Sequence, residues 1–453
     1  MAIRFFPKTR FLRILFFTAI FLVILFTLPH YWGNYLYRKA ITHAKEQGVE
    51  LDFLKLAPPE IPYKENAWAI LERVFAQMDQ HDQTFHEIHQ HFAQIEQMTK
   101  EILAKKQKLS AEEIANLERE IAPYQTLFEI LEPAFEREKC RFLTDYNIVN
   151  PAAIAVPNFL HHQRLFTLLQ IQCLLDSSKG NREAAYRDLR KMFRFNQWTF
   201  EESPFLIAVL IGFNTLRTTC VTLNALECIE PPTQAERESI VREINKFRIH
   251  EQFIRSIEFE RAVMHEGGER FLAGEFGDVG DQISPLIQFT LRYPGRFIIR
   301  ANQAYYLETM SKMIEWLHLP AYQSFSHWNH YDPQTDLPAI AFIAKSIMFN
   351  CNNVAKRRDE TLARLDEVRL SFALFDFKEK NGAYPQELSA IRDAFVGEMP
   401  IDPFTGKDYV YQKKENGYLL YSYGKNMQDN GGEYQIDPHN RNEIKDDLIW
   451  AIP

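Results

Sequence analysis

The feature that most constrains this chain is an uncharged apolar segment near its N-terminus. No Lys, Arg, Asp or Glu lies between Arg13 and Arg38. A helix rises about 1.5 Å per residue, so residues 14–37 are long enough to cross the roughly 30 Å hydrocarbon layer of a bilayer. The segment is Phe-rich and apolar on all faces, unlike the amphipathic surface helix of a soluble domain. We therefore expect a transmembrane helix whose partner is the lipid bilayer.

The residues that flank this segment predict its orientation. Basic residues precede it, and segments rich in Lys and Arg stay in the cytoplasm. Aromatic residues, which collect at membrane–water interfaces, follow its apolar part. We expect a single-pass protein of the bacterial cytoplasmic membrane, with a cytoplasmic N-terminus and a periplasmic or other extracytoplasmic body. The basic residues are Arg4, Lys8, Arg10 and Arg13, and the aromatic residues are Tyr31, Trp32, Tyr35 and Tyr37.

A cleaved signal peptide is the alternative interpretation of the same segment. Cleavage requires small residues just after the apolar core. Residues 29–32 read Pro-His-Tyr-Trp and are bulky throughout. The sequence therefore favours an uncleaved anchor.

Composition narrows the fold and the partners. The 17 glycines among 453 residues are few, which argues against glycine-rich phosphate loops and against a turn-dense all-β fold. Lys plus Arg number 52 and Asp plus Glu number 60, which gives a net charge of −8 and no electrostatic support for binding nucleic acid. We expect a mainly α protein.

Composition shifts divide the chain into four parts. Residues 1–37 form the cytoplasmic tip and the anchor. Residues 38–62 form a stalk and a hinge, because three prolines interrupt residues 57–62. Residues 63–340 form an exported helical domain, a bundle or hairpin array. Residues 341–453 form a long helix followed by a small α+β module.

Local signals place several helices in the exported domain. Ser110 with Glu113 and Thr233 with Glu236 are capping boxes, which mark helix starts. Residues 157–227 read as three helices joined by short connections, which predicts antiparallel neighbours. The paired glycines at 267 and 268 should end a helix, and residues 267–340 should form short helical pieces and loops.

The C-terminal module has the pattern of a β-hairpin followed by a polar loop. Tyrosines alternate on both sides of a turn at residues 415–417, which predicts two antiparallel strands. A polar loop follows, and an apolar segment ends at Trp450.

From about Leu362 to Trp450 the chain resembles the globular part of the major pseudopilin of type II secretion systems. Motifs of that family occur here in the same order, over about a fifth of the chain. The whole layout also resembles uncharacterised bacterial membrane-anchored proteins that end in this module, which implies no activity. The motifs are a long helix ending near Gly382-x-Tyr-Pro, the Asp402-Pro-Phe turn, Tyr421-Ser-x-Gly, Gly431-Gly-Glu and a closing Asp447-apolar-apolar-Trp.

The resemblance implies a calcium site in the polar loop, because the family binds calcium there. Calcium takes oxygen ligands from carboxylates, amides and carbonyls in flexible loops. The departure at Asn426, where the family usually has an aspartate, removes one negative charge and should weaken the site. The alternative is a solvated loop held by Asx turns without metal. The candidate ligands are Asn426, Asp429, Glu433, Asp446 and Asp447.

The N-terminus departs from the same family. The chain begins Met-Ala-Ile-Arg and has no pseudopilin processing motif before its apolar segment. A large helical region also separates the anchor from the long helix, whereas the two are continuous in pseudopilins. We therefore do not expect prepilin-peptidase cleavage or assembly into a pilus-like fibre.

Other residues offer weaker candidates for chemistry. His86 and His89 lie on one helical face, as a metal pair requires, although a solvent-facing polar stripe has the same spacing. His265 and Glu266 begin a zinc-protease-like pattern, but Glu269 replaces its second histidine. The five cysteines have no C-x-x-C spacing.

Two functional hypotheses follow. The first is a non-enzymatic single-pass envelope protein that acts as a scaffold for other envelope proteins, linked to type II secretion or surface assembly. It assigns no catalytic or cofactor-binding residue apart from the calcium loop. The alternative is an exported metal-dependent hydrolase that uses His265 or the His86 cluster.

Overall fold

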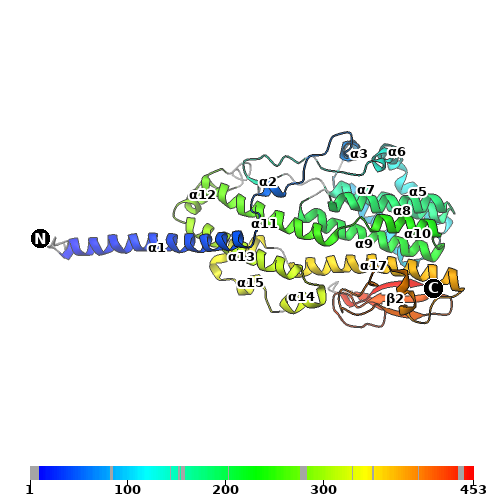
Figure 1. The fold of residues 1–453 in the computed structure, drawn as a ribbon. Coiled ribbons are helices and arrows are strands. Elements are labelled where there is room, and N and C mark those ends of the chain that lie inside the picture. The colour runs from blue at the N-terminus through cyan, green and yellow to red at the C-terminus, as the bar shows by residue number, and fades with distance from the viewer. Residues whose placement is uncertain are drawn as a thin grey trace.

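The computed structural model shows a mainly helical protein with a small C-terminal sheet, which confirms the predicted fold class at that level (Figure 1). A single long helix projects from a body of packed helices. The structure describes residues 10–81, 85–142, 144–151, 154, 159–201, 204–275, 283–328, 330–348, 351–395, 397–436 and 443–453.

The projecting helix is α1 (Arg10–Glu46), and it contains the apolar segment. Residues 13–46 contain a strongly apolar stretch, and no residue of that stretch is buried inside the protein. Pro29 lies inside α1 without ending it. By length and composition α1 is therefore a candidate membrane span.

The second half of α1 packs on the body, whereas we predicted a stalk. Ala40 and Ala44 are buried, and Ala40 packs with Ala304 and Leu307 of α13 (Arg296–Leu317). These alanines are four residues apart, so they lie on one face and allow the two helices to approach closely. The short α2 (Phe53–Leu56) follows and packs on α11 (Ile249–Ala273).

The helices expected from local signals form the centre of the body. Both capping boxes are confirmed, with reciprocal bonds between Ser110 and Glu113 and between Thr233 and Glu236. The three-helix pattern is also present, with α7 packed on α8 and α8 on α9. The elements are α3 (Trp68–His81), α4 (Phe85–Lys105), α5 (Ala111–Ile121), η1 (Ala122–Tyr124), α6 (Gln125–Leu131), η2 (Glu132–Glu136), α7 (Phe159–Ser178), α8 (Arg182–Glu201), α9 (Leu206–Ile229) and α10 (Gln234–Ile244).

α9 is the second helix in the described residues that is long and apolar enough to cross a membrane. In contrast to α1, 67% of its apolar window is buried inside the protein. Its neighbours are α7, α8, α11 and α17 (Cys351–Asn381). We interpret α9 as the central core helix of the body.

Residues 267–340 are more regular than we predicted. α11 continues through Gly267 and Gly268 instead of ending there, because its packing against α9 and α13 outweighs the cost of about 1 kcal/mol per glycine. α13 is a further long helix in this region. The other elements here and up to α17 are α12 (Pro285–Arg292), α14 (Ala321–Trp328), α15 (Pro333–Asp336), η5 (Ala339–Ala341) and α16 (Phe342–Ile347).

The C-terminal module contains the predicted hairpin. β1 (Val410–Lys413) and β2 (Tyr418–Ser422) are antiparallel, and β5 (Leu448–Ile452) pairs with the other edge of β2. A second pair consists of β3 (Tyr434–Ile436) and β4 (Glu443–Asp446). α17 ends at Asn381 before Gly382, which has the positive φ of a helix C-cap. The short η6 (Leu388–Ala394) lies between α17 and β1.

Buried polar contacts join this module to the helical body. The carboxylate of Glu227 in α9 accepts hydrogen bonds from Trp450 Nε1 at 2.8 Å and from Ser371 Oγ at 3.1 Å. The hydroxyl of Tyr418 donates to Ser371 at 2.8 Å. All four side chains are almost fully buried. The sheet and α9 therefore share one continuous core.

Candidate functional site

The junction between α1 and the body is the first candidate site. Gly33 of α1 lies against Phe297 of α13, where a Cβ would be 2.6 Å from the Phe297 carbonyl oxygen. Nearby, Nε2 of His30 is 3.0 Å from the carbonyl oxygen of Tyr293. A glycine inside an otherwise apolar helix thus marks the point where α1 meets the body.

A polar cluster lies a turn further along α1. The hydroxyl of Tyr37 is 3.1 Å from Nε2 of His265, and the two rings stack. The guanidinium of Arg300 lies over the Tyr37 ring, 4.1 Å from its centroid, and forms an ion pair with Glu269. The side-chain amide of Gln303 donates to Glu269 at 2.9 Å. Three helices, α1, α11 and α13, meet in this cluster.

The charge states in the cluster favour a structural role. Burial lowers the pKa of His265, which keeps its imidazole neutral near pH 7. Burial would raise the pKa of Glu269, but hydrogen bonds from Arg300 and Tyr37 outweigh it and lower the pKa. A neutral imidazole and an ionised carboxylate, each bonded to another helix, hold α1 in place. His265 and Glu269 do not converge on a shared open position, as a zinc-protease pair would.

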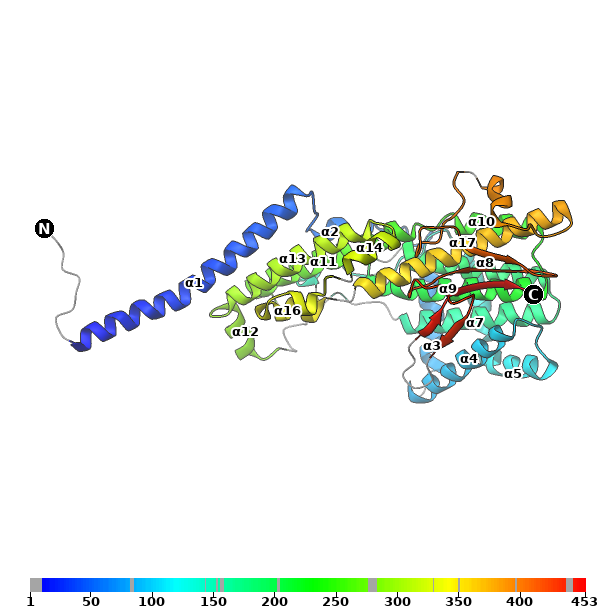
Figure 2. The same cartoon turned by 90° about the horizontal axis from the view of Figure 1, so that it is seen from below.

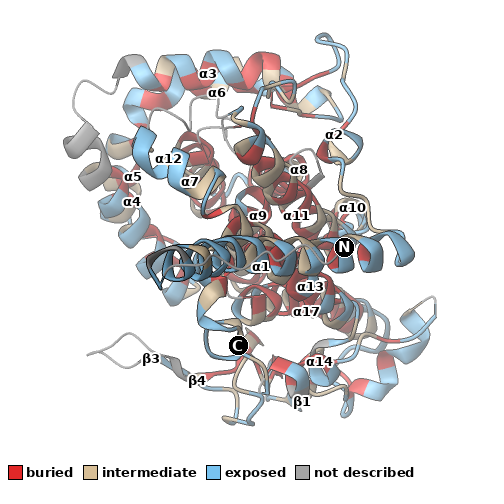
Figure 3. Cartoon of the chain, turned by 90° about the vertical axis from the view of Figure 1, so that its left-hand side faces the viewer, coloured by how far each residue is buried: buried red, intermediate tan, exposed pale blue. Residues whose placement is uncertain are grey.

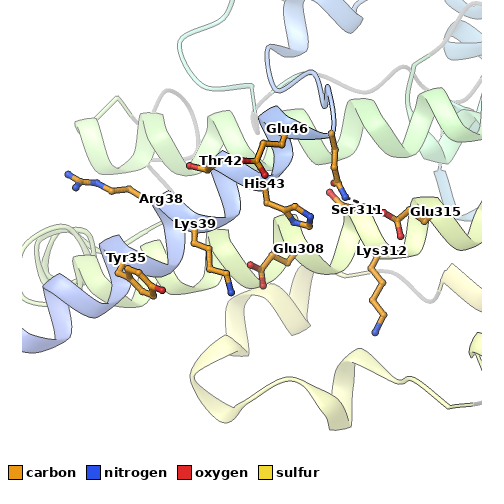
Figure 4. Close-up of a pocket in the computed structure, with 11 residues that line it drawn as sticks. Tyr35, Arg38, Lys39, Thr42, His43, Glu46, Glu308, Ser311, Lys312 and Glu315 are labelled. Atoms are coloured by element: carbon orange, nitrogen blue, oxygen red, sulfur yellow. Dashed lines mark hydrogen bonds between the residues drawn. The ribbon is translucent and has the colours of Figure 1, made fainter.

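An open groove lies beside this cluster, between α1 and α13 (Figure 4). Its volume is about 700 Å³, and its walls carry charges of both signs. Gln47 crosses one end and donates to Glu315 at 3.2 Å. The groove is open to solvent, so it does not exclude water as a closed reaction site does. The charged lining residues are Arg38, Lys39, Glu46, Glu308, Lys312 and Glu315.

The five candidate calcium ligands lie in and beside the loop after β2, at its contacts with β4 and β5. Asp447 accepts hydrogen bonds from the backbone amides of Asn430 and Gly432, at 3.1 Å and 2.7 Å. Asp446 accepts from the backbone amide of Asn426 at 3.0 Å. These two buried carboxylates therefore bind the loop to the sheet.

The remaining candidate ligands are also engaged. Asp429 accepts from the hydroxyl of Tyr421 at 2.9 Å and from the amide of Gly431. The Asn426 oxygen accepts from the amide of Gln428 at 2.7 Å, which is an Asx turn. Glu433 pairs with Lys445.

No metal cluster is evident in the described part of the chain. Among those residues, no group of three or more His, Cys, Asp or Glu side chains is placed to hold a metal ion. Amide and carbonyl oxygens also bind calcium, so the calcium site remains a prediction.

The other histidines have separate surroundings. His161 is 2.6 Å from the carboxylate of Asp79, and His162 is hydrogen-bonded to Thr199 in the core. Burial lowers the pKa of His162 to about 3, so it is neutral. The side chains of His86 and His89 lie outside the described residues.

Sequence reasoning missed Tyr37, Arg300 and Gln303 as partners of His265 and Glu269. Tyr37 is in α1, and Arg300 and Gln303 are in α13, so both helices are far in the chain from His265 and Glu269 in α11 and no local pattern joins them. The available signal was the pair of helical glycines at 33 and 268. A Cβ at Gly268 would lie 2.6 Å from the amide nitrogen of Gln303.

Comparisons with protein-family models, curated proteins and solved structures found no match to this chain.

Proposed function

We propose that this chain is a non-enzymatic scaffold of the bacterial cell envelope. It is anchored in the cytoplasmic membrane by the apolar part of residues 14–37, which ends before the aromatic residues that begin at Tyr31. Its body lies outside the cytoplasm and contacts other envelope proteins, in type II secretion or surface assembly. The pseudopilin-like module supplies one of its contact surfaces.

One observation carries this proposal: α1 has an exposed apolar half and a docked half within one unbroken helix. The contacts of Gly33, Tyr37 and Ala40 with the body allow no free swivel between them. A rigid connection of this kind holds the body at a set height and orientation above the bilayer. A scaffold needs such an arrangement, whereas a soluble enzyme does not.

The hydrolase alternative has less support from the side-chain contacts. His265 is stacked on Tyr37, and Glu269 is paired with Arg300. Both residues therefore have a structural role that accounts for their burial. The two hypotheses differ in their requirements. The hydrolase requires the imidazole of His265, whereas the scaffold requires the attachment of the body to the membrane through α1.

Complementation of a deletion strain separates the two hypotheses. Secretion and surface assembly are measured with the full chain, with a His265→Gln variant, and with a body released by a cleavable leader in place of α1. Gln removes the imidazole but keeps a polar group for the Tyr37 hydroxyl that holds α1. The scaffold predicts that His265→Gln restores the phenotype and that the released body does not. Rescue by the released body together with failure of a folded His265→Gln variant would support the hydrolase instead.

A further inference from the structure

α12 turns its apolar side chains outward. Leu286, Ile287 and Phe289 are 73%, 52% and 59% exposed, and Tyr293 at the end of the helix is 57% exposed. No residue from Pro285 to Arg292 is buried. Leu286, Phe289 and Tyr293 are spaced by three and four residues, so they share one face.

The polar side chains of α12 make its other contacts. Arg292 donates from its guanidinium to the carbonyl oxygen of Ala273, at the end of α11. Gln288 donates at 2.8 Å to the carbonyl oxygen of Ile283, just before α12 in the same segment. A surface helix of a soluble domain has the reverse arrangement, with its apolar side chains inward. Contiguous exposed apolar residues of this kind mark a surface that binds a partner or a membrane.

The position of α12 identifies that partner. The carbonyl oxygen of Tyr293, directly after α12, is bonded to His30 of α1. His30 lies where the apolar half of α1 ends, next to the exposed aromatic residues Tyr31 and Trp32. Aromatic residues mark the level of the membrane–water interface. The residue directly after α12 thus contacts α1 at the level where the span leaves the bilayer.

The views of the whole molecule agree with this placement. α12 lies at the end of the body nearest the exposed half of α1, and β2 and the C-terminus lie at the opposite end (Figures 1 and 2). Seen from the N-terminal side, α12 lies on the near face of the body with exposed residues along it (Figure 3).

We propose that α12 is an interfacial helix whose side chains Leu286, Ile287 and Phe289 insert into the outer leaflet beside α1. This inference rests on the proposed function, because it requires α1 to span the membrane. Tyr293, directly after α12, contacts His30 where the apolar half of α1 ends, so the occupant is the bilayer and not a second protein. An amphipathic helix with such a face lies in the plane of the headgroups. Two attachments, α1 and α12, then fix the tilt of the body.

Depth-dependent fluorescence quenching tests this proposal with the full chain. An environment-sensitive fluorophore is attached to Ile287→Cys, and the protein is reconstituted in phosphatidylcholine vesicles. Quenching is compared between a lipid carrying a spin label near its glycerol and aqueous iodide. Four native cysteines are buried and Cys228 is half-buried, so the unsubstituted chain measures background labelling.

Two matched positions make the result specific. Phe21→Cys reports the span itself, and Ile401→Cys reports an exposed apolar residue in the C-terminal module. The proposal predicts a loss of fluorescence at 287 with the spin-labelled lipid comparable to that at Phe21, and little loss with iodide. Position 401 should show the reverse.

The outcomes separate failure of α12 from failure of the anchor. Lipid quenching at Phe21 but iodide quenching at Ile287 would overturn the interfacial helix and leave the anchor intact. Protection of Ile287 from both quenchers would show that protein covers it, which also overturns the proposal. Absence of lipid quenching at Phe21 would overturn the anchor, and α12 with it.

Discussion

Replacing Glu227 with Gln should remove a pH dependence that this buried carboxyl imposes on the stability of the fold. Glu227 is 1% exposed. Burial is the largest influence on it and raises its pKa from 4.5 to about 8, although hydrogen bonds from Trp450 and Ser371 lower it. The folded protein therefore holds a proton at pH 7 that the unfolded chain releases.

The sign and the size follow from this difference. Below pH 4.5 both states are protonated and the full stability is present. Between pH 4.5 and about 8 only the folded state holds the proton, so the free energy of unfolding falls as pH rises. At about 1.4 kcal/mol per pH unit, the loss is about 3 kcal/mol at pH 7 and about 5 kcal/mol above pH 8. Gln keeps an oxygen for Trp450 and does not ionise.

Urea unfolding of the full chain in detergent, followed by tryptophan fluorescence from pH 4.5 to 8.5, measures this effect. The difference in unfolding free energy between Glu227→Gln and the unsubstituted chain should grow with pH in favour of Gln. Burial also raises the pKa of Glu367, to about 7, which gives a second dependence of stability on pH. Both chains contain Glu367, so this dependence cancels in the difference between them. Glu112→Gln, at an exposed position, serves as the control. A difference that does not change with pH would refute the reasoning.

Three further substitutions or additions test the junction and the loop. Gly33→Ala places a Cβ against the Phe297 backbone and should destabilise the fold by about 1–3 kcal/mol in urea, whereas Thr42→Ala on the exposed side of α1 should change little. Glu269→Gln weakens the pairing with Arg300 and should cost about 1–3 kcal/mol by the same assay. The control is Glu266→Gln, because the partner of Glu266, Arg270, is more exposed than Arg300 and its ion pair should contribute less. Millimolar calcium should raise the melting temperature of the full chain relative to chelator, and Asp447→Asn should reduce that rise; no shift with calcium would contradict the predicted site.

Local features of the fold could be predicted because their causes are local. The capping boxes at Ser110 and Thr233 satisfy free amides with side chains three residues away, and both occur as expected. The hairpin of β1 and β2 likewise depends on a short turn and alternating tyrosines. The apolar segment of α1 is visible because its whole length is apolar.

Features that depend on contacts between distant segments could not be predicted. Gly268 disfavours a helix in isolation, yet α11 continues through it, because the missing side chain makes room for Gln303. The stalk is packed because Ala40 faces Leu307, a residue far away in the chain. The sequence of α12 does not indicate which of its apolar side chains face outward, or that Tyr293 beside it contacts α1.

Accessibility to an impermeant reagent tests the central claim, that the chain crosses the bilayer with its body outside. Single cysteines are placed at Thr9 in the N-terminal tip and at Ile401 in the C-terminal module, and intact spheroplasts are treated with a membrane-impermeant maleimide. The account predicts that Ile401→Cys is labelled in intact spheroplasts and that Thr9→Cys is labelled only after lysis. Labelling of Ile401→Cys only after lysis would contradict the membrane topology and the proposals that depend on it.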